Sequence, residues 1–487
     1  MNSSPLNNHF LDGGRRAKIV CTMGPASNSA RMIDRLVRAG MDVARLNFSH
    51  GTYPEHAAIV ELIRAASGRY QKPIAILADL PGPKIRTGPL DGGQSVLLRN
   101  GQRFAISTER RVGNAQGVSV NYPRLHAEVR RGDRILLSDG LIELRVESYS
   151  GKRILCRVIN GGQLGEHKGV NLPGVRLSVP AVTPQDRRHL AFALSCGVNY
   201  VGVSFVRRAE DILDAKRAVA RHGKKTPIIA KLEKPEAIDN LESILAVTDG
   251  VMVARGDLGV EMSPERVPVV QKLVIARARE TLVPVITATQ MLESMTEHPR
   301  PTRAEASDVA NAIFDGSDAV MLSAETAAGH YPVESVEMMD RIIREAESNI
   351  TRFSRPHPGA RITVPDAVAD LICHASEELN LKVVAVFTES GSTARLISKH
   401  RPLPPIIAFS RNQDTRRRIS LYWGVQARKC SMVRDVEDMA AHAEKRLLEE
   451  RLVKRGDVVG IVAGTPFGIG GNTNLVKFHT VGGDKRR

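Results

Sequence analysis

Short apolar runs alternate with amphipathic stretches along most of the chain, as expected of repeated strand–helix units that build a parallel sheet. Between the strands, Ser27 to Ser29 can cap a helix that Gly40 ends, and Thr183 with Asp186 forms a capping-box pattern. The spacing of eight apolar runs predicts a closed (β/α)8 barrel with strands at residues 18–22, 42–46, 73–78, 200–205, 227–231, 250–254, 284–288 and 319–322.

The spacing is interrupted between the third and fourth predicted strands. Residues 87–174 carry short alternating runs and glycine turns, which predict a small all-β barrel domain inserted in a βα loop as a lid. Past the eighth unit, Arg355 to Gly359 is typical of a linker, and strands predicted at 383–387, 406–409 and 458–462 indicate an open α/β domain. We expect a flexible leader at 1–16, the barrel at 17–86 and 175–354, the lid domain at 87–174 and a C-terminal regulatory α/β domain at 355–487.

Composition argues against membrane and nucleic-acid functions. The 487 residues are 42% hydrophobic, enough for several buried cores. No apolar stretch approaches the ~18 residues that a membrane span needs, and the opening Met1 to Ser4 lacks a signal pattern, so we expect a cytoplasmic protein without membrane contact. The formal charge of +16 comes from scattered basic residues and aromatics are only 4%, which favours small polyanionic partners over nucleic acid. Five single cysteines support neither disulfides nor a zinc site.

Candidate chemistry follows from the strand ends, where functional groups gather in such barrels. Lys231 and Glu233 end the fifth strand on one side of it, and Asp257 follows the sixth. An ammonium beside two carboxylates suits a divalent ion and phosphoryl transfer. Other strands end in polar residues at Arg45, Asn47, Ser49, His50, Asp79, Lys84, Arg86, Thr289, Ser323 and Glu325.

These segments resemble the pyruvate kinase family along nearly the whole chain. The matching motifs are RLNFSHG at residues 45–51, VARGDLG at 253–259, ATQMLESM at 288–295, PTRAE at 301–305 and MLSAET at 321–326. The resemblance implies phosphoryl transfer from phosphoenolpyruvate to ADP, giving pyruvate and ATP. It also implies Mg²⁺, with Mn²⁺ as a substitute, and a homotetramer.

The resemblance also implies roles for particular residues. Glu233 and Asp257 would hold the metal, Lys231 and Arg45 would neutralise the phosphoryl group, and the amides of Gly256 and Asp257 would receive the substrate carboxylate. Plainer interpretations stay open: a surface lysine, a helix cap at Asp257, a strand residue at Thr289 and a structural histidine at His50. The family's proton-delivery side resembles Thr289, Ser323 and Glu325, and its nucleotide side matches Asn47, His50 and Arg86.

Two departures from the family pattern change the expected site. Potassium-requiring members carry Thr, Lys and Glu where this chain has Leu80, Pro81 and Lys84. We therefore hypothesise that the Lys84 ammonium, near Asn47, Ser49 and Asp79, supplies the charge of K⁺, so that K⁺ is not required. The alternative is an exposed lysine without that role. Ala328 stands where many relatives have a lysine, which puts nucleotide contacts there in doubt.

The terminal domain carries a candidate phosphate pocket. Its hydroxyls and amides lie where a helix should start, at Thr388, Ser390, Gly391, Ser392 and Thr393, with a glycine run at 468–471. Family analogy implies an allosteric site for a phosphorylated effector, whereas the plainer interpretation is helix capping. Two other functions also stay open: a Mg²⁺-dependent barrel aldolase or lyase, and a catalytically silent phosphometabolite sensor.

Overall fold

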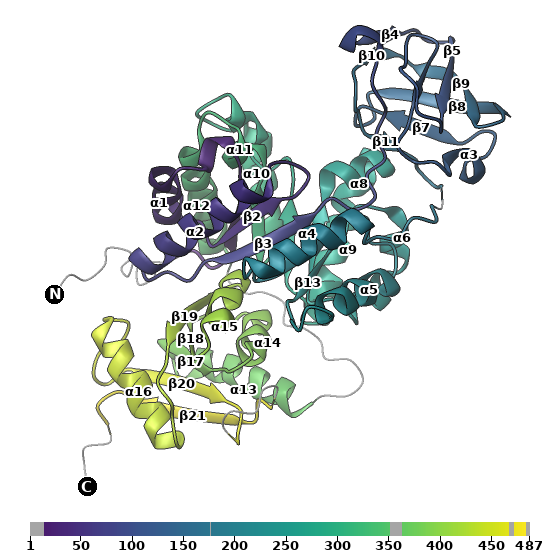
Figure 1. The fold of residues 1–487 in the computed structure, drawn as a ribbon. Helices are drawn as coiled ribbons and strands as arrows, with labels where there is room; N and C mark the ends of the chain where they lie inside the picture. The colour runs from purple at the N-terminus through teal and green to yellow at the C-terminus, as the bar shows by residue number, and fades with distance from the viewer. Residues whose placement is uncertain (1–13, 176, 351–362, 467–471, 484–487) are drawn as a thin grey trace.

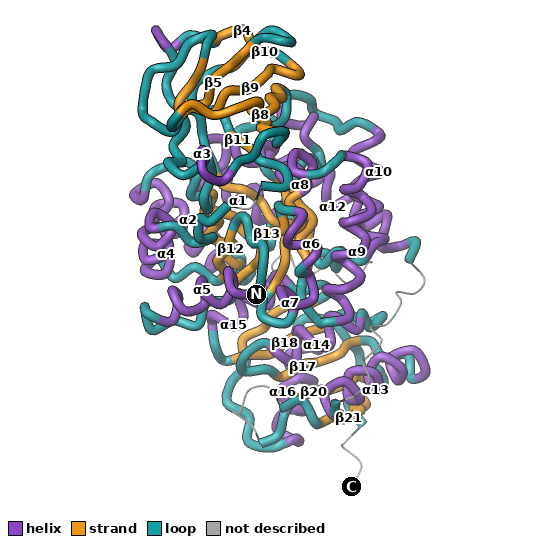
Figure 2. Tube along the Cα trace, turned by 90° about the vertical axis from the view of Figure 1, so that its right-hand side faces the viewer, coloured by secondary structure: helices purple, strands orange, loops and turns teal. Residues whose placement is uncertain are grey.

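The computed structural model describes residues 14–175, 177–350, 363–466 and 472–483. Its eight-stranded parallel barrel lies between an all-β domain on one side and an α/β domain on the other (Figures 1 and 2). The predicted barrel is confirmed, with the strand order β1-β16-β15-β14-β13-β12-β3-β2. The strands are β1 (Lys18–Met23), β2 (Val43–Asn47), β3 (Ala75–Leu80), β12 (Tyr200–Val203), β13 (Ile228–Leu232), β14 (Gly250–Ala254), β15 (Val285–Ala288) and β16 (Ala319–Leu322).

Helices surround the barrel, and two predicted caps are present. The Ser29 hydroxyl accepts a hydrogen bond from the Met32 amide at the start of α1, and Gly40 ends that helix with φ 130°. Thr183 and Asp186 form the capping box of α4. The helices are α1 (Ala30–Ala39), α2 (Tyr53–Arg69), α4 (Pro184–Ser195), α5 (Ala209–Ala220), α6 (Pro235–Asp239), α7 (Leu241–Leu245), α8 (Arg255–Glu261), α9 (Val267–Glu280), α10 (Arg303–Asp315), α11 (Ala324–Ala327) and α12 (Pro332–Ser348), with 3₁₀ turns η2 (Pro25–Ser27), η4 (Pro264–Arg266) and η5 (Glu293–Thr296).

The inserted domain is built almost entirely of strands. Hydrogen bonds group them into a six-stranded sheet, β11-β7-β8-β9-β5-β6, and a two-stranded sheet, β10-β4, so no closed ring of strands occurs in its described residues. Its own apolar core includes Phe104 and Leu144. The elements are η3 (Asp91–Gly93), β4 (Val96–Leu98), β5 (Arg103–Ser107), β6 (Gly117–Ser119), α3 (Leu125–Glu128), β7 (Arg134–Leu137), β8 (Ile142–Ser150), β9 (Arg153–Asn160), β10 (Gly162–Leu164) and β11 (Val170–Asn171).

The C-terminal domain is an open sheet with the order β19-β18-β17-β20-β21, in which only β21 is antiparallel to its neighbour. Strands β19 and β21 were not predicted. The predicted linker at 355–359 and the glycine run at 468–471 lie outside the described residues. The elements are α13 (Val364–Glu378), β17 (Val383–Phe387), α14 (Ser392–His400), β18 (Ile406–Ser410), α15 (Gln413–Arg418), η6 (Ile419–Leu421), β19 (Val425–Lys429), α16 (Val436–Glu449), β20 (Val458–Ala463) and β21 (Leu475–Thr480).

The C-terminal domain closes the end of the barrel where the strands begin. Leu421 packs in the same buried cluster as the barrel-lining residues Val20, Ile229 and Met252. The Tyr200 hydroxyl at the start of β12 donates to the Arg418 carbonyl over 2.9 Å. The strand ends that carry the candidate chemistry lie at the opposite end, on the side of the inserted domain (Figure 1).

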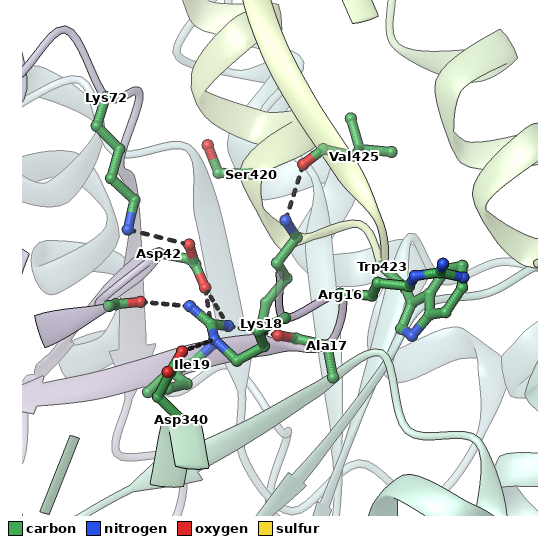
Figure 3. A network of polar contacts seen from close by, with 12 residues as sticks. Arg16, Ala17, Lys18, Ile19, Asp42, Lys72, Asp340, Ser420, Trp423 and Val425 are labelled. Carbon is green, nitrogen blue, oxygen red and sulfur yellow. Dashed lines mark hydrogen bonds and ion pairs between the residues drawn. The ribbon is translucent and has the colours of Figure 1, made fainter. Parts of the chain in front are cut away.

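The segment before β1 joins the barrel to the C-terminal domain (Figure 3). Arg15 pairs with Asp42 and Asp340, both over 2.8 Å, and the Lys18 ammonium donates to the Val425 carbonyl over 2.8 Å. Arg16 lies over the Trp423 ring at 5.3 Å from its centre. Residues 1–13 of the expected flexible leader lie outside the described residues. Arg15 and Arg16, at its end, pack at this junction and are held by charged hydrogen bonds.

Asp42 concentrates the charge of this junction, so its replacement tests the junction's stability. Burial favours the neutral acid, but Arg15, Lys72 and Lys18 outweigh burial and hold the pKa of Asp42 well below its usual range. We expect Asp42→Asn to lower the free energy of unfolding by about 3 kcal/mol at pH 7, because it leaves buried cations short of a counter-charge. Because the folded pKa is depressed, this difference should persist above an unfolded pKa of about 3.9 and shrink at lower pH.

The measurement is urea unfolding followed by fluorescence of Trp423, the only tryptophan in the sequence. Glu210→Gln is the matched control, because Glu210 forms an exposed pair with Arg208 and should change stability by less than about 0.5 kcal/mol. Equal stability of Asp42→Asn and the wild type at pH 7 would contradict the expectation.

Candidate active site

The Lys231 ammonium lies at the centre of a buried polar cluster at the strand ends. Its Nζ is 2.8 Å from Glu233 Oε1 and 3.2 Å from Asp79 Oδ1. It also donates to the Ser204 hydroxyl over 2.7 Å. Burial alone would lower the pKa of Lys231, but the carboxylates of Asp79 and Glu233 outweigh it and raise that pKa. The lysine is therefore a fixed cation at neutral pH.

Asp79, at the end of β3, joins Lys231 to a second cation. Its Oδ2 accepts from Arg45 Nε over 2.7 Å, and the same guanidinium donates to the Thr22 hydroxyl over 3.0 Å. Asp79 is 1% exposed; burial works against its charge, but Lys231 and Arg45 hold the pKa of this carboxyl below its usual value. Gly202 is its neighbour on β12, and a side-chain carbon there would lie 3.2 Å from Asp79 Oδ1. This close approach explains the glycine within a strand.

Glu233 and Asp257 lie at the ends of the paired strands β13 and β14. Glu233 Oε2 accepts the Phe205 amide over 2.8 Å. Burial raises the pKa of Glu233 to about 7 against the opposing effect of Lys231, and the Asp257 carboxylate adds to the rise. A buried carboxylate whose proton affinity is raised beside a second carboxylate is a suitable ligand for a divalent cation, which can replace the proton.

The donor set fits Mg²⁺ in part. No group of three or more His, Cys, Asp or Glu side chains suited to a metal occurs in the described part of the chain. Mg²⁺ is commonly bound through one or two carboxylates, with water and substrate oxygens completing its shell. Glu233 and Asp257 therefore meet the protein's share of such a shell.

Thr289 follows β15 in a strained turn that Arg255 holds in place. The φ angles of Thr289 and Gln290 are 69° and 53°, in the left-handed region that a β-branched residue disfavours. Arg255 donates to the Thr289 carbonyl over 2.6 Å and to Asp308 over 2.7 Å. The Thr289 hydroxyl accepts the Gly256 amide over 2.8 Å and donates to the Ala288 carbonyl over 2.6 Å.

Ser323 and Glu325 lie next to each other at the end of β16. Glu325 accepts the amides of Ser323 over 2.6 Å and Leu292 over 3.1 Å, which ties this strand end to the loop after β15. Burial raises the pKa of Glu325. The Ser323 hydroxyl is buried without a hydrogen-bond partner among the residues that the structure describes. This hydroxyl therefore keeps an unused hydrogen-bonding capacity, although the oxygen is covered in the structure.

The structure does not bring every predicted residue into this cluster. His50 is exposed in the turn after β2, and Arg86 donates to the His167 carbonyl of the inserted domain over 3.4 Å. Asn47 accepts the Ser49 amide over 3.1 Å in the same turn as His50. Lys84 is exposed, and the carbon next to its ammonium lies close to Gly169 of the inserted domain. Among the described residues, its ammonium forms no ion pair with Asp79.

Sequence reasoning missed two residues that position the two cations, Thr22 and Ser204. Thr22 and Ser204 supply hydroxyls to Arg45 and Lys231, and Asp79 bridges the cations, whereas it was expected only beside a monovalent ion. The sequence signal that could have identified Thr22 and Ser204 is a hydroxyl-bearing residue at the end of an apolar strand. Asp79 was predicted as a polar strand end, but its pairing with both cations was not.

The fold and this cluster define a (β/α)8-barrel enzyme with a charged centre suited to phosphoryl transfer. Two family profiles match the chain: "Pyruvate kinase, barrel domain" at residues 14–336 and "Pyruvate kinase, alpha/beta domain" at residues 366–479. The chain belongs to the pyruvate kinase family. It is a phosphotransferase whose substrates and products are phosphoenolpyruvate, ADP, pyruvate and ATP.

Individual relatives agree over almost the whole length. The chain is 45% identical to the pyruvate kinase of Mycobacterium intracellulare, covering 96% of this chain and 99% of that protein. It is 44% identical to the pyruvate kinase of Geobacillus stearothermophilus, covering 96% of this chain and 80% of that protein. A crystal structure of a pyruvate kinase from Cryptosporidium parvum superimposes with a TM-score of 0.90 at 36% identity, covering 97% of both chains.

The helices of the described residues can be compared with the length and hydropathy that a membrane span needs. None of the helices within them is both long enough and apolar enough to span a bilayer.

Proposed function

We propose that the Lys231 cluster is the phosphoryl-transfer centre. The observation that carries the proposal is the pair of cations held by one buried carboxylate, with Lys231 and Arg45 at 3.2 Å and 2.7 Å from Asp79. Their charge can offset the negative charge that spreads over a phosphoryl group in transfer. Mg²⁺ held by Glu233 and Asp257 would supply further positive charge and orient substrate oxygens.

The remaining site residues take their roles from their places around this centre. Ser323 has a free buried hydroxyl, which supports the proton-delivery side, with Glu325 holding its amide. The Gly256 amide donates to the Thr289 hydroxyl, so the substrate carboxylate that we assign to the amides of Gly256 and Asp257 would replace the Thr289 hydroxyl as the acceptor at Gly256. The exposed His50 with Asn47 and Arg86 would contact the nucleotide.

Activity with named components tests this centre. The protein with phosphoenolpyruvate, ADP and Mg²⁺ should form pyruvate, chelation should abolish turnover, and Mg²⁺ or Mn²⁺ should restore it. Lys231→Met should lower kcat by about a thousandfold, since a fixed charge aimed at the transition state is lost. Lys224→Met, at an exposed lysine, should retain activity. Undiminished turnover of Lys231→Met would reject the assigned role.

We also propose that the enzyme does not require K⁺, because Lys84 replaces an acid of the potassium-requiring sequences and brings its own positive charge to the loop after β3. Asn47, Ser49 and Asp79 are the groups that it would approach. Since Lys84 is exposed and belongs to the connection to the inserted domain, its ammonium can change position with that domain.

Replacing K⁺ by tetramethylammonium should therefore leave turnover within about twofold, a change smaller than 1 kcal/mol in the barrier. Lys84→Glu should create a requirement for K⁺, because an uncompensated acid would then need a monovalent cation. Lys152→Glu, an exposed change in the inserted domain, serves as the control. A collapse of wild-type turnover without K⁺ would refute the proposal.

A third proposal concerns the C-terminal domain, where a cavity of about 130 Å³ adjoins the start of α14. Hydroxyls of Thr388, Ser390 and Ser392 line it together with Arg411, and the helix start faces the same loop. Hydroxyls, a guanidinium and a helix N-terminus suit a phosphate group. Gly391 and the buried Thr393 hold the loop, the latter through the Thr473 hydroxyl at 2.9 Å. We assign this cavity to a phosphorylated effector that activates the enzyme.

Titration with sugar phosphates and AMP, followed by turnover at low phosphoenolpyruvate, tests the effector site. Ser390→Glu should abolish activation because a carboxylate repels the phosphate, while basal turnover stays unchanged. The exposed Ser390 is a better position for this change than Thr393, which is 4% exposed. Ser243→Glu in α7 is the control. Activation that survives Ser390→Glu would place the effector elsewhere. The homotetramer, the cytoplasmic location and the domain limits stay predictions from the sequence.

A further inference from the structure

The last turn of α8 touches the inserted domain at two points. The Asn171 side chain of β11 donates to Glu261 Oε1 over 2.9 Å. A side-chain carbon at Gly140 would lie 3.6 Å from Cγ1 of Val260. Figures 1 and 2 both show β11 next to α8. Because α8 begins with Arg255, Gly256 and Asp257, one short helix connects the inserted domain with the active site.

Glu261 also bonds to the residue that follows Glu233, the other candidate metal ligand. The Lys234 ammonium donates to the same Glu261 oxygen over 2.6 Å, and Lys234 directly follows Glu233. This ammonium lies 5.9 Å from the centre of the Phe205 ring, whose residue donates its amide to Glu233. One carboxylate thus touches the inserted domain and the segment after β13.

The burial of Glu261 makes this contact specific. Glu261 is 5% exposed, and its Oε2 is buried without a hydrogen-bond partner in the described parts of the chain. A buried carboxylate is costly unless its hydrogen bonds are made, so the donors Asn171 and Lys234 matter to it. The free oxygen has the capacity for a further donor from the inserted domain.

Two chain segments connect the inserted domain to the barrel, and they pair with each other at residues 85–87 and 168–170. The Val170 amide donates to the Ile85 carbonyl over 3.0 Å, and the Thr87 amide donates to the Lys168 carbonyl over 2.9 Å. These bonds form a two-stranded connection, and Arg207 of the barrel donates to the Leu177 and Val179 carbonyls of its second segment over 2.6 Å and 2.7 Å. The placement of the domain therefore depends on the few contacts that hold this connection to the barrel, among them that of Asn171 with Glu261.

We propose that Glu261 is a positioning residue that docks the inserted domain onto α8, so that the placement of the domain and of the metal-ligand carboxylates is set together. The inference rests on the proposed metal role of Glu233 and Asp257. In this proposal the docked placement, with Asn171 bonded to Glu261, is the one that binds the nucleotide and limits the access of water to the site. A weaker dock lowers the population of that arrangement, so more nucleotide is needed to reach the same turnover.

Opposite charges at position 171 test the dock. Asn171→Asp should raise the KM for ADP about tenfold, because a carboxylate replaces the donor opposite Glu261, while kcat at saturating ADP stays within about twofold. Asn171→Lys should keep the KM for ADP at or below the wild-type value, since its ammonium can donate to Glu261. A merely structural role of the side chain predicts no such dependence on the sign of the charge.

The same two changes in a Glu261→Gln background separate docking from a general electrostatic effect on the anionic nucleotide. We expect the difference in KM between Asp and Lys at position 171 to shrink to less than about threefold there. Asn160→Asp and Asn160→Lys, at an exposed position of the same domain, are the matched controls and should have equal KM values. Thermal unfolding checks that all variants fold.

Equal KM values for Asn171→Asp and Asn171→Lys, or a difference that persists undiminished with Glu261→Gln, would overturn the proposal. Neither result touches the phosphoryl-transfer assignment, which fails instead if the wild type forms no pyruvate with Mg²⁺ or if Lys231→Met remains fully active.

Discussion

The buried carboxylate of Asp79 is the constraint on which the active site depends. Two cations, Lys231 and Arg45, would repel each other at the barrel mouth without an anion between them. Asp79 forms an ion pair with each of them, and its own burial is tolerated because both cations compensate its charge. The result is a fixed concentration of positive charge at a place where the barrel strands end, which is what the transfer of an anionic group requires.

The parallel barrel makes this arrangement possible because its strand ends converge from segments far apart in the sequence. Arg45 comes from β2, Asp79 from β3 and Lys231 from β13, and Gly202 on β12 leaves room for the Asp79 carboxylate. The C-terminal domain seals the opposite end through Leu421, so the apolar interior is closed there. Each domain therefore acts on a different end of the same barrel.

The sequence predicted the barrel because each strand is a continuous apolar run between helix caps, and it predicted Lys231 and Glu233 as partners because they alternate with Leu232. The roles of Asp79, Thr22 and Ser204 depend on contacts between distant strands, which no local pattern encodes. Strand β21 was missed because only one of its six residues is buried, so its sequence lacks a continuous apolar run. Arg15 was assigned to a leader because its partner Asp340 is 325 residues away in the sequence.

The bond from Lys18 to Val425 has a consequence for the order of events during synthesis. The ammonium of the first barrel strand is 4% exposed, yet its acceptor belongs to a strand made more than four hundred residues later, at a separation of 407 positions. Until the ribosome has released that part of the chain, Lys18 must remain solvated or unsatisfied. The nascent barrel can therefore acquire its final form only after nearly the entire polypeptide has emerged.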